Sequence, residues 1–163
     1  MGKDDQSQRG QSAARSYRAA LARLVRGEGR GLSSRQFEDI VGRVIERGAR
    51  AVLFFTLAER KQVNYLKETY GNRTLLFEQD DMAGVAALIE GCTALISCNT
   101  DLLHMAIALQ TPTVGIFDED SQRWISQRNY SGKIVQSKDI RAISITDIVD
   151  ALEEVLQREG KKK

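Results

Sequence analysis

The sequence predicts an α/β fold, a Rossmann-like parallel sheet of about four or five strands flanked by helices. Short apolar runs alternate with stretches of helical periodicity from about residue 33 to residue 158, and this alternation is typical of βαβ units. The run at 51–56 is unbroken and apolar, as expected for a strand buried on both faces. The 163 residues are 42% hydrophobic with a formal net charge of +2, which predicts one ordered domain with a real core.

Two helices are expected before the first strand. An amphipathic helix over 12–26 is predicted by the spacing of Ala14, Tyr17, Ala20, Leu21, Leu24 and Val25. The glycine-rich GEGRG stretch at 27–31 ends it. A second helix is capped by Ser33 or Ser34, ends at Gly48, and has an inward face made of Phe37, Ile40, Val41, Val44 and Ile45.

The rest of the chain predicts a regular alternation. We expect strands at 51–56, 74–78, 93–98 and 112–117, with a short fifth strand at 133–136. Helices are expected at 59–70, 81–91, 101–110 and 145–158. The chain thus divides into a basic N-terminal segment (1–31), a Rossmann-like domain (32–158) and a lysine tail (159–163).

Charge is distributed unevenly along the chain. Residues 1–50 carry 11 basic and 6 acidic side chains, whereas residues 51–160 carry 10 basic and 16 acidic ones. The basic helix at 12–26 and the lysine tail could therefore contact nucleic acid, an acidic protein or an anionic lipid surface, or form a solvated helix surface. No apolar run is long enough for a transmembrane helix, and no secretory signal opens the chain.

Cysteine and histidine are scarce. Cys92 and Cys98 are too few for a disulfide framework, and the single histidine, His104, gives no metal-ligand set. Cys98 at a strand end could have a lowered pKa or be an inert buried thiol. These counts favour a reduced, intracellular compartment and imply neither a metal nor another cofactor. No Walker A or GxGxxG motif is present.

Candidate site residues follow the predicted strands, because ligands of open α/β sheets bind beyond the carboxyl ends of the strands. The turn after 93–98 is the most informative, since Asn99, Thr100 and Asp101 can all cap the following helix. Free backbone N–H groups and the helix dipole could hold a phosphate there. His104, in the first turn, could donate to a phosphate oxygen or be structural.

The stretch AALIEGCTALISCNTDLLHMAIALQTPTVGIF (86–117) resembles the C-terminal domain of the ADP-heptose:lipopolysaccharide heptosyltransferase family, glycosyltransferases of family 9 with the GT-B fold. That family has a motif of the form D-[TS]-G-x-x-H-[LM]-A, and residues 99–106 here are NTDLLHMA. The similarity extends more weakly over 32–156. It implies a nucleotide-sugar site, with Thr100, Asp101 and His104 at the pyrophosphate of a donor such as ADP-heptose. Glu59 would lie near the ribose, and Met82 against the base or in the core.

The resemblance also implies a missing half. The family's enzymes have an N-terminal domain of similar size that binds the acceptor, so this chain alone would need that domain or a partner chain to transfer a sugar. A role in lipopolysaccharide biosynthesis, in the cytoplasm or at the inner face of the membrane, is implied.

Departures from the family pattern concentrate at the phosphate site. Asn99 replaces an acidic residue, Asp101 replaces a glycine, and 118–120 is acidic where the family often has a glycine. The family's first strand, with its glycine-rich turn, has no clean counterpart, because the helix at 12–26 occupies that part of the chain. We therefore expect a donor-binding domain whose phosphate site is weakened; the alternative is a non-catalytic interaction module that uses its basic helix.

Overall fold

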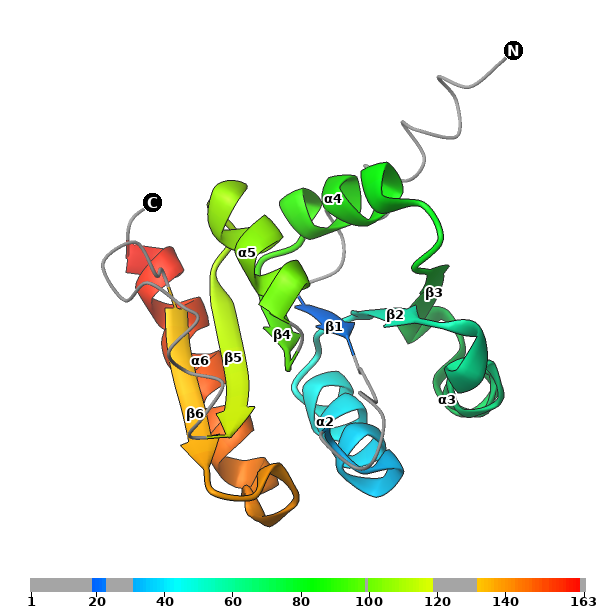
Figure 1. The fold of residues 1–163 in the computed structure, drawn as a ribbon, viewed down its shortest axis with the longest axis horizontal. Coiled ribbons are helices and arrows are strands. Elements are labelled where there is room, and N and C mark those ends of the chain that lie inside the picture. The colour runs from blue at the N-terminus through cyan, green and yellow to red at the C-terminus, as the bar shows by residue number, and fades with distance from the viewer. Residues whose placement is uncertain (1–18, 23–30, 99, 119–131, 162–163) are drawn as a thin grey trace.

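The computed structural model describes residues 19–22, 31–98, 100–118 and 132–161 (Figure 1). Their strands form one six-stranded sheet in the order β3-β2-β1-β4-β5-β6, in which every neighbouring pair is parallel. The strands are β1 (Ala19–Ala22), β2 (Ala51–Phe55), β3 (Thr74–Glu78), β4 (Leu95–Ser97), β5 (Thr113–Asp118) and β6 (Gly132–Ser137). The predicted parallel α/β fold is confirmed, with six strands instead of four or five.

Helices cover both faces of the sheet (Figure 1). One face carries α2 (Ser34–Glu46), α3 (Arg60–Tyr70) and α6 (Ile145–Lys161), and the other carries α4 (Met82–Gly91) and α5 (Thr100–Ala108). Short 3-10 turns lie at Leu57–Glu59, Gly71–Arg73 and Ile140–Ala142. All five helices predicted after residue 31 are therefore present in the described part of the chain.

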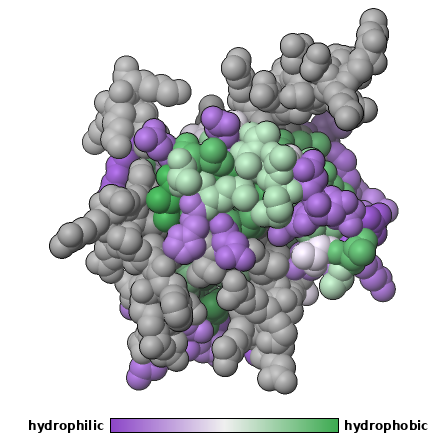
Figure 2. Space-filling view, turned by 45° about the horizontal axis from the view of Figure 1, so that its top comes forward, coloured by the Kyte–Doolittle hydropathy of each residue, from purple (hydrophilic) through white to green (hydrophobic). Residues whose placement is uncertain are grey.

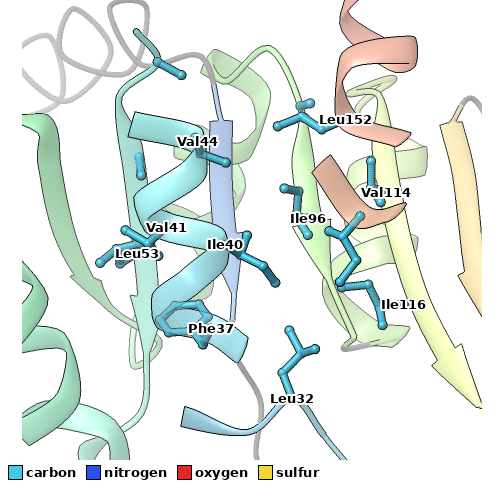
Figure 3. Close-up of a cluster of buried hydrophobic side chains, with 14 of the residues drawn as sticks. Leu32, Phe37, Ile40, Val41, Val44, Leu53, Ile96, Val114, Ile116 and Leu152 are labelled. Carbon is cyan, nitrogen blue, oxygen red and sulfur yellow. The ribbon is translucent and has the colours of Figure 1, made fainter. Parts of the chain in front are cut away.

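The core has two layers, one on each side of the sheet. Successive residues of β2 contribute to opposite layers. Ala51, Leu53 and Phe55 belong to one cluster, and Val52 and Phe54 belong to the other. Such a strand, buried on both faces, explains the unbroken apolar run in the sequence. In the first cluster one face of α2 packs against residues of β2, β4 and β5 (Figure 3). The α2 residues are Phe37, Ile40, Val41 and Val44, and the strand residues are Leu53, Ile96, Val114 and Ile116.

The α4–α5 layer is also apolar on its outer side. Met82, Ala83 and Ala87 of α4 and Ala108 of α5 are exposed, and Figure 2 shows an apolar area on this face with hydrophilic residues around it. The inner side of α4 is buried and carries Val85, Leu88 and Ile89. Because α4 is apolar on both its inner and its outer side, its sequence lacks a sharp amphipathic pattern.

Helix α2 begins with a capping box that also ties it to the end of the domain. The Ser33 hydroxyl accepts the Gln36 backbone N–H at 3.1 Å, and Gln36 Oε1 accepts the Ser33 N–H at 2.9 Å. The Gln36 amide nitrogen then donates to the carbonyls of Ile140 (3.2 Å) and Arg141 (3.1 Å). One buried side chain therefore satisfies polar groups on α2 and on the turn that precedes α6.

The N-terminal helix prediction is wrong for residues 19–22. Ala19–Ala22 form β1, which pairs with β2 on one side and β4 on the other. Alanine and leucine are strong helix formers, but pairing on both edges of a central strand overrides this local preference. The described residues do not include the rest of the predicted helix (12–18 and 23–26), most of the glycine-rich stretch (27–30) or the segment 119–131.

The part of the chain in which the sequence predicted a helix in place of a first strand therefore contains a strand, β1. It is followed in the sequence by arginines and by Gly27, Gly29 and Gly31. At one edge of the sheet, β6 is longer than predicted and begins at Gly132. A Cβ at Gly132 would collide with the backbone carbonyl of Thr113, so only glycine permits β6 to approach β5 there.

None of the helices in the described part of the chain has the length and apolar composition of a membrane span.

Replacement of Gln36 by alanine tests the capping contact. We expect Gln36→Ala to lower the free energy of unfolding by about 2–3 kcal/mol, because it removes the capping box and leaves buried carbonyls without a donor. Urea unfolding measures the change. The matched control is Gln62→Ala, whose amide makes a solvent-exposed bond to the Ser34 carbonyl; its cost should stay below about 1 kcal/mol. Equal costs for the two variants would contradict the structural role of Gln36.

Candidate functional site

The strand order defines a switch point beside β1. From β1 the chain moves to β2 and β3 on one side, then crosses back to β4 on the other side of β1 and continues to β5 and β6. Helix α2, which follows β1, lies on one face of the sheet, whereas α5, which follows β4, lies on the other (Figure 1). In open α/β sheets a crevice forms at such a point, beyond the carboxyl ends of the two strands where the order reverses. Here those strands are β1 and β4.

Helix α5 begins at this point. Ser97 ends β4, Cys98 follows, and the helix starts at Thr100. Its first N–H groups have no intrahelical partner, and the helix dipole makes this end positive. The position predicted from the sequence as an anion site thus coincides with the switch point. Asn99 and the side chain of Thr100 lie outside the described residues.

Asp101 and His104 lie on the outer side of α5. Both side chains are exposed, whereas Leu102 and Leu103 between them are 1% and 0% exposed. Residues three apart are neighbours on a helix surface, so the carboxylate and the imidazole share one face of the first turn. His104 is therefore available to a ligand and is not a buried core histidine.

Glu59 is held in the turn that follows β2. It is 5% exposed, and its Oε2 accepts the backbone N–H of Thr56 at 3.2 Å. The Glu59 N–H donates to the Thr56 carbonyl at 2.9 Å. The carboxylate is thus fixed at the carboxyl end of β2, the neighbour of β1, and can accept hydroxyl groups with its remaining lone pairs.

Arg60 and Gln79 join this edge, although the sequence alone did not single them out. Arg60 Nη2 lies 3.1 Å from Glu78 Oε2, and its guanidinium lies over the Phe55 ring at 5.8 Å from the centroid. The Gln79 N–H donates to the Phe55 carbonyl at 2.8 Å, so the ends of β2 and β3 are tied together. The Gln79 amide nitrogen is buried, with no hydrogen-bond partner among the described residues. A donor of this kind suits a ligand or a water.

Met82 begins α4, directly after the carboxyl end of β3. Asp81 caps this helix by accepting the Gly84 N–H at 3.1 Å. Met82 is 47% exposed, so the alternative that it belongs to the core is wrong. Its contact with a base stays a prediction.

Negative charge gathers at the same edge. The carboxyl ends of the strands and the turns after them carry Glu59, Glu78, Asp80, Asp81, Asp101 and Asp118. Exposed carboxylates repel phosphate, whereas the positive end of α5 attracts it. The edge therefore combines an anion-binding backbone with side chains that oppose an anion.

The two cysteines differ in their surroundings. Cys98 is half-buried and packs against the core cluster of α2, α3 and α6. Cys92 directly follows α4 and is buried in the second core cluster. This burial raises the pKa of the Cys92 thiol to about 12.

Comparison with known proteins now decides the family. The model of glycosyltransferase family 9 (heptosyltransferase) matches residues 32–151. The chain belongs to this family. No curated protein sequence matches it.

Solved structures show the same fold as this family 9 chain at low identity. The glycosyl transferase family 9 protein from Veillonella parvula has a TM-score of 0.79 and 14% identity, over 97% of this chain and 53% of that one. The ADP-heptose heptosyltransferase II of E. coli has a TM-score of 0.72 and 14% identity, over 98% and 54%. The E. coli heptosyltransferase WaaC with ADP-2-deoxy-2-fluoro heptose has a TM-score of 0.74 and 16% identity, over 94% and 49%. The chain spans about half the length of each.

Thiol labelling tests the environment of Cys92. With Cys98→Ser in place, we expect Cys92 to react with iodoacetamide at about pH 8 roughly 1,000-fold more slowly than an exposed thiol, because a pKa of about 12 leaves little thiolate. Mass spectrometry of the labelled chain gives the rate. Labelling in guanidinium chloride is the control and should be fast. Fast labelling of the folded chain would show that Cys92 is accessible.

Proposed function

We propose that this chain is the nucleotide-sugar-binding half of a heptosyltransferase-like glycosyltransferase. The observation that supports this best is the exposed first turn of α5, with His104, at the switch point between β1 and β4. A diphosphate would accept hydrogen bonds from the first N–H groups of α5 and from the imidazole. ADP-heptose is the donor that the family resemblance implies, and the WaaC structure was solved with an ADP-heptose analogue.

The nucleoside would lie toward β2 and β3 in this proposal. Glu59 would accept the two ribose hydroxyls, because its carboxylate is fixed at the end of β2. The base would pack on the exposed side chain of Met82. This arrangement assigns the diphosphate to one side of β1 and the nucleoside to the other.

Diphosphate binding would be weakened by Asp101. An acidic side chain in the first helical turn stabilises the helix by its interaction with the dipole. The same negative charge offsets the positive potential that would otherwise attract phosphate. At an effective dielectric constant of about 20, two like charges about 4 Å apart repel by roughly 4 kcal/mol. Exposure of Asp101 to water reduces this penalty, so we expect weakened and not abolished binding.

Sugar transfer would require a second half. Donor and acceptor must be held in line across a cleft, and this chain spans about half the length of the solved relatives. An N-terminal acceptor domain or a partner chain would supply the other wall. Lipopolysaccharide biosynthesis in the cytoplasm, at the inner face of the membrane, is the setting that the family resemblance suggests.

The alternative, an interaction module built on a basic helix at 12–26, loses part of its basis. Ala19–Ala22 form a central strand, so the predicted helix cannot be continuous through these residues.

Glu59→Gln tests the nucleoside part of the proposal. The unmodified chain should bind ADP more tightly than 2′-deoxy-ADP, and Glu59→Gln should lower the affinity for ADP by about tenfold to a hundredfold while removing this preference. Isothermal titration calorimetry measures both affinities. The amide can still accept the Thr56 N–H, and an unchanged thermal midpoint will show that the turn is intact. An undiminished preference for ADP would exclude Glu59 from the ribose.

Substitution of Asp101 tests the phosphate part. We expect Asp101→Gly and Asp101→Asn each to bind ADP about tenfold to a hundredfold more tightly at low salt, because the repulsion is removed. The gain should shrink as ionic strength rises. Asp147→Asn is the matched control, since Asp147 is an exposed acidic residue in the first turn of α6, and it should leave the affinity unchanged. Tight ADP binding by the unmodified chain, equal to that of Asp101→Gly, would refute the weakened site.

A further inference from the structure

Helices α2 and α3 lie on the same face of the sheet (Figure 1), and an open groove runs between their N-terminal halves. Its volume is about 560 Å³, within the range of roughly 300–1,000 Å³ that small-molecule sites occupy. The turn after β2 closes one end. The residues that line the groove are Ser34, Glu38, Thr56, Ala58, Glu59, Lys61, Gln62 and Tyr65.

The walls of the groove are held together by Gln62. Its amide nitrogen donates to the Ser34 carbonyl at 2.9 Å and lies 3.4 Å from Glu38 Oε1. The two hydrogen bonds fix the amide and the Glu38 carboxylate in place across the groove. A carboxylate has about four lone-pair sites, so Glu38 can accept further hydroxyl groups.

An aromatic ring completes the lining. Tyr65 follows Gln62 by one turn of α3 and is 56% exposed. It is one of three large hydrophobic side chains exposed in the described part of the chain, with Leu57 and Met82. An accessible ring of this kind offers an apolar face and a hydroxyl to a ligand that has both apolar and polar sides.

The charges in the groove favour a neutral ligand. Glu38 and Glu59 oppose an anion, whereas Lys61 and the positive ends of α2 and α3 oppose a cation. We propose that this groove binds a neutral saccharide, whose ring stacks on Tyr65 and whose hydroxyl groups bond to Glu38 and Gln62. Because Glu59 also lines the groove, the saccharide would lie beside a bound nucleotide. That adjacency rests on the proposed function, but saccharide binding itself does not.

Titration of the full chain with methyl α-D-mannopyranoside, followed by ¹⁵N NMR, tests the proposal. We expect shift changes to concentrate in residues 34–38 and 56–65. Tyr65→Ala should weaken binding by about threefold to tenfold, because it removes the stacking surface, and Tyr65→Phe should retain it. The matched control is Asn64→Ala, an exposed neighbour on α3 that does not line the groove, and it should bind like the unmodified chain.

The absence of shift changes in the groove would overturn the proposal, as would equal affinity in Tyr65→Ala and Asn64→Ala. Binding of spermidine in the groove in preference to the sugar would show a cation site and would also overturn it. ADP is titrated separately, and its affinity should be the same in Tyr65→Ala. A chain that binds ADP without the sugar refutes the saccharide groove, whereas one that binds the sugar without ADP refutes only the nucleotide proposal.

Discussion

Pairing of β1 between β2 and β4 is the interaction on which the rest of the structure depends. It joins β2 and β3 to β4, β5 and β6 in one sheet, and it creates the reversal of strand order at which ligands of open α/β sheets bind. Without this strand the two halves would have no shared edge, and the first turn of α5 would lie at the border of a smaller sheet. A four-residue strand therefore decides both the continuity of the core and the position of the candidate site.

The site reflects a conflict between local helix stability and ligand binding. Asp101 in the first turn of α5 stabilises the helix because it complements the dipole, yet the same dipole is what a diphosphate would use. Two other acidic side chains at this edge have structural roles, since Glu78 pairs with Arg60 and Asp81 caps α4. Asp101 departs from the family motif at a position directly on the proposed phosphate path.

Most of the fold could be predicted because its elements have strong local signals. The run 51–56 is apolar throughout, and α2 has a capping serine and a regular apolar face. The strand β1 was missed because four alanine- and leucine-rich residues between arginines fit a helix equally well, and the pairing that decides their conformation is distant in sequence. The sequence also led to Glu59, Met82 and His104 as candidate site residues, and their contacts with a ligand stay predictions. It could not single out Gln79 or Arg60, since their contacts depend on how the ends of β2 and β3 meet.

The most direct test of a ligand site at the switch point is a map of ADP binding on the ¹⁵N-labelled chain. If the first turn of α5 holds the diphosphate, millimolar ADP will shift the amide resonances of Thr100 to His104 most strongly. Smaller shifts are expected at Thr56 to Glu59 and at Met82, where the nucleoside would lie. Shifts confined to other surfaces, or a spectrum that ADP leaves unchanged, would contradict the account.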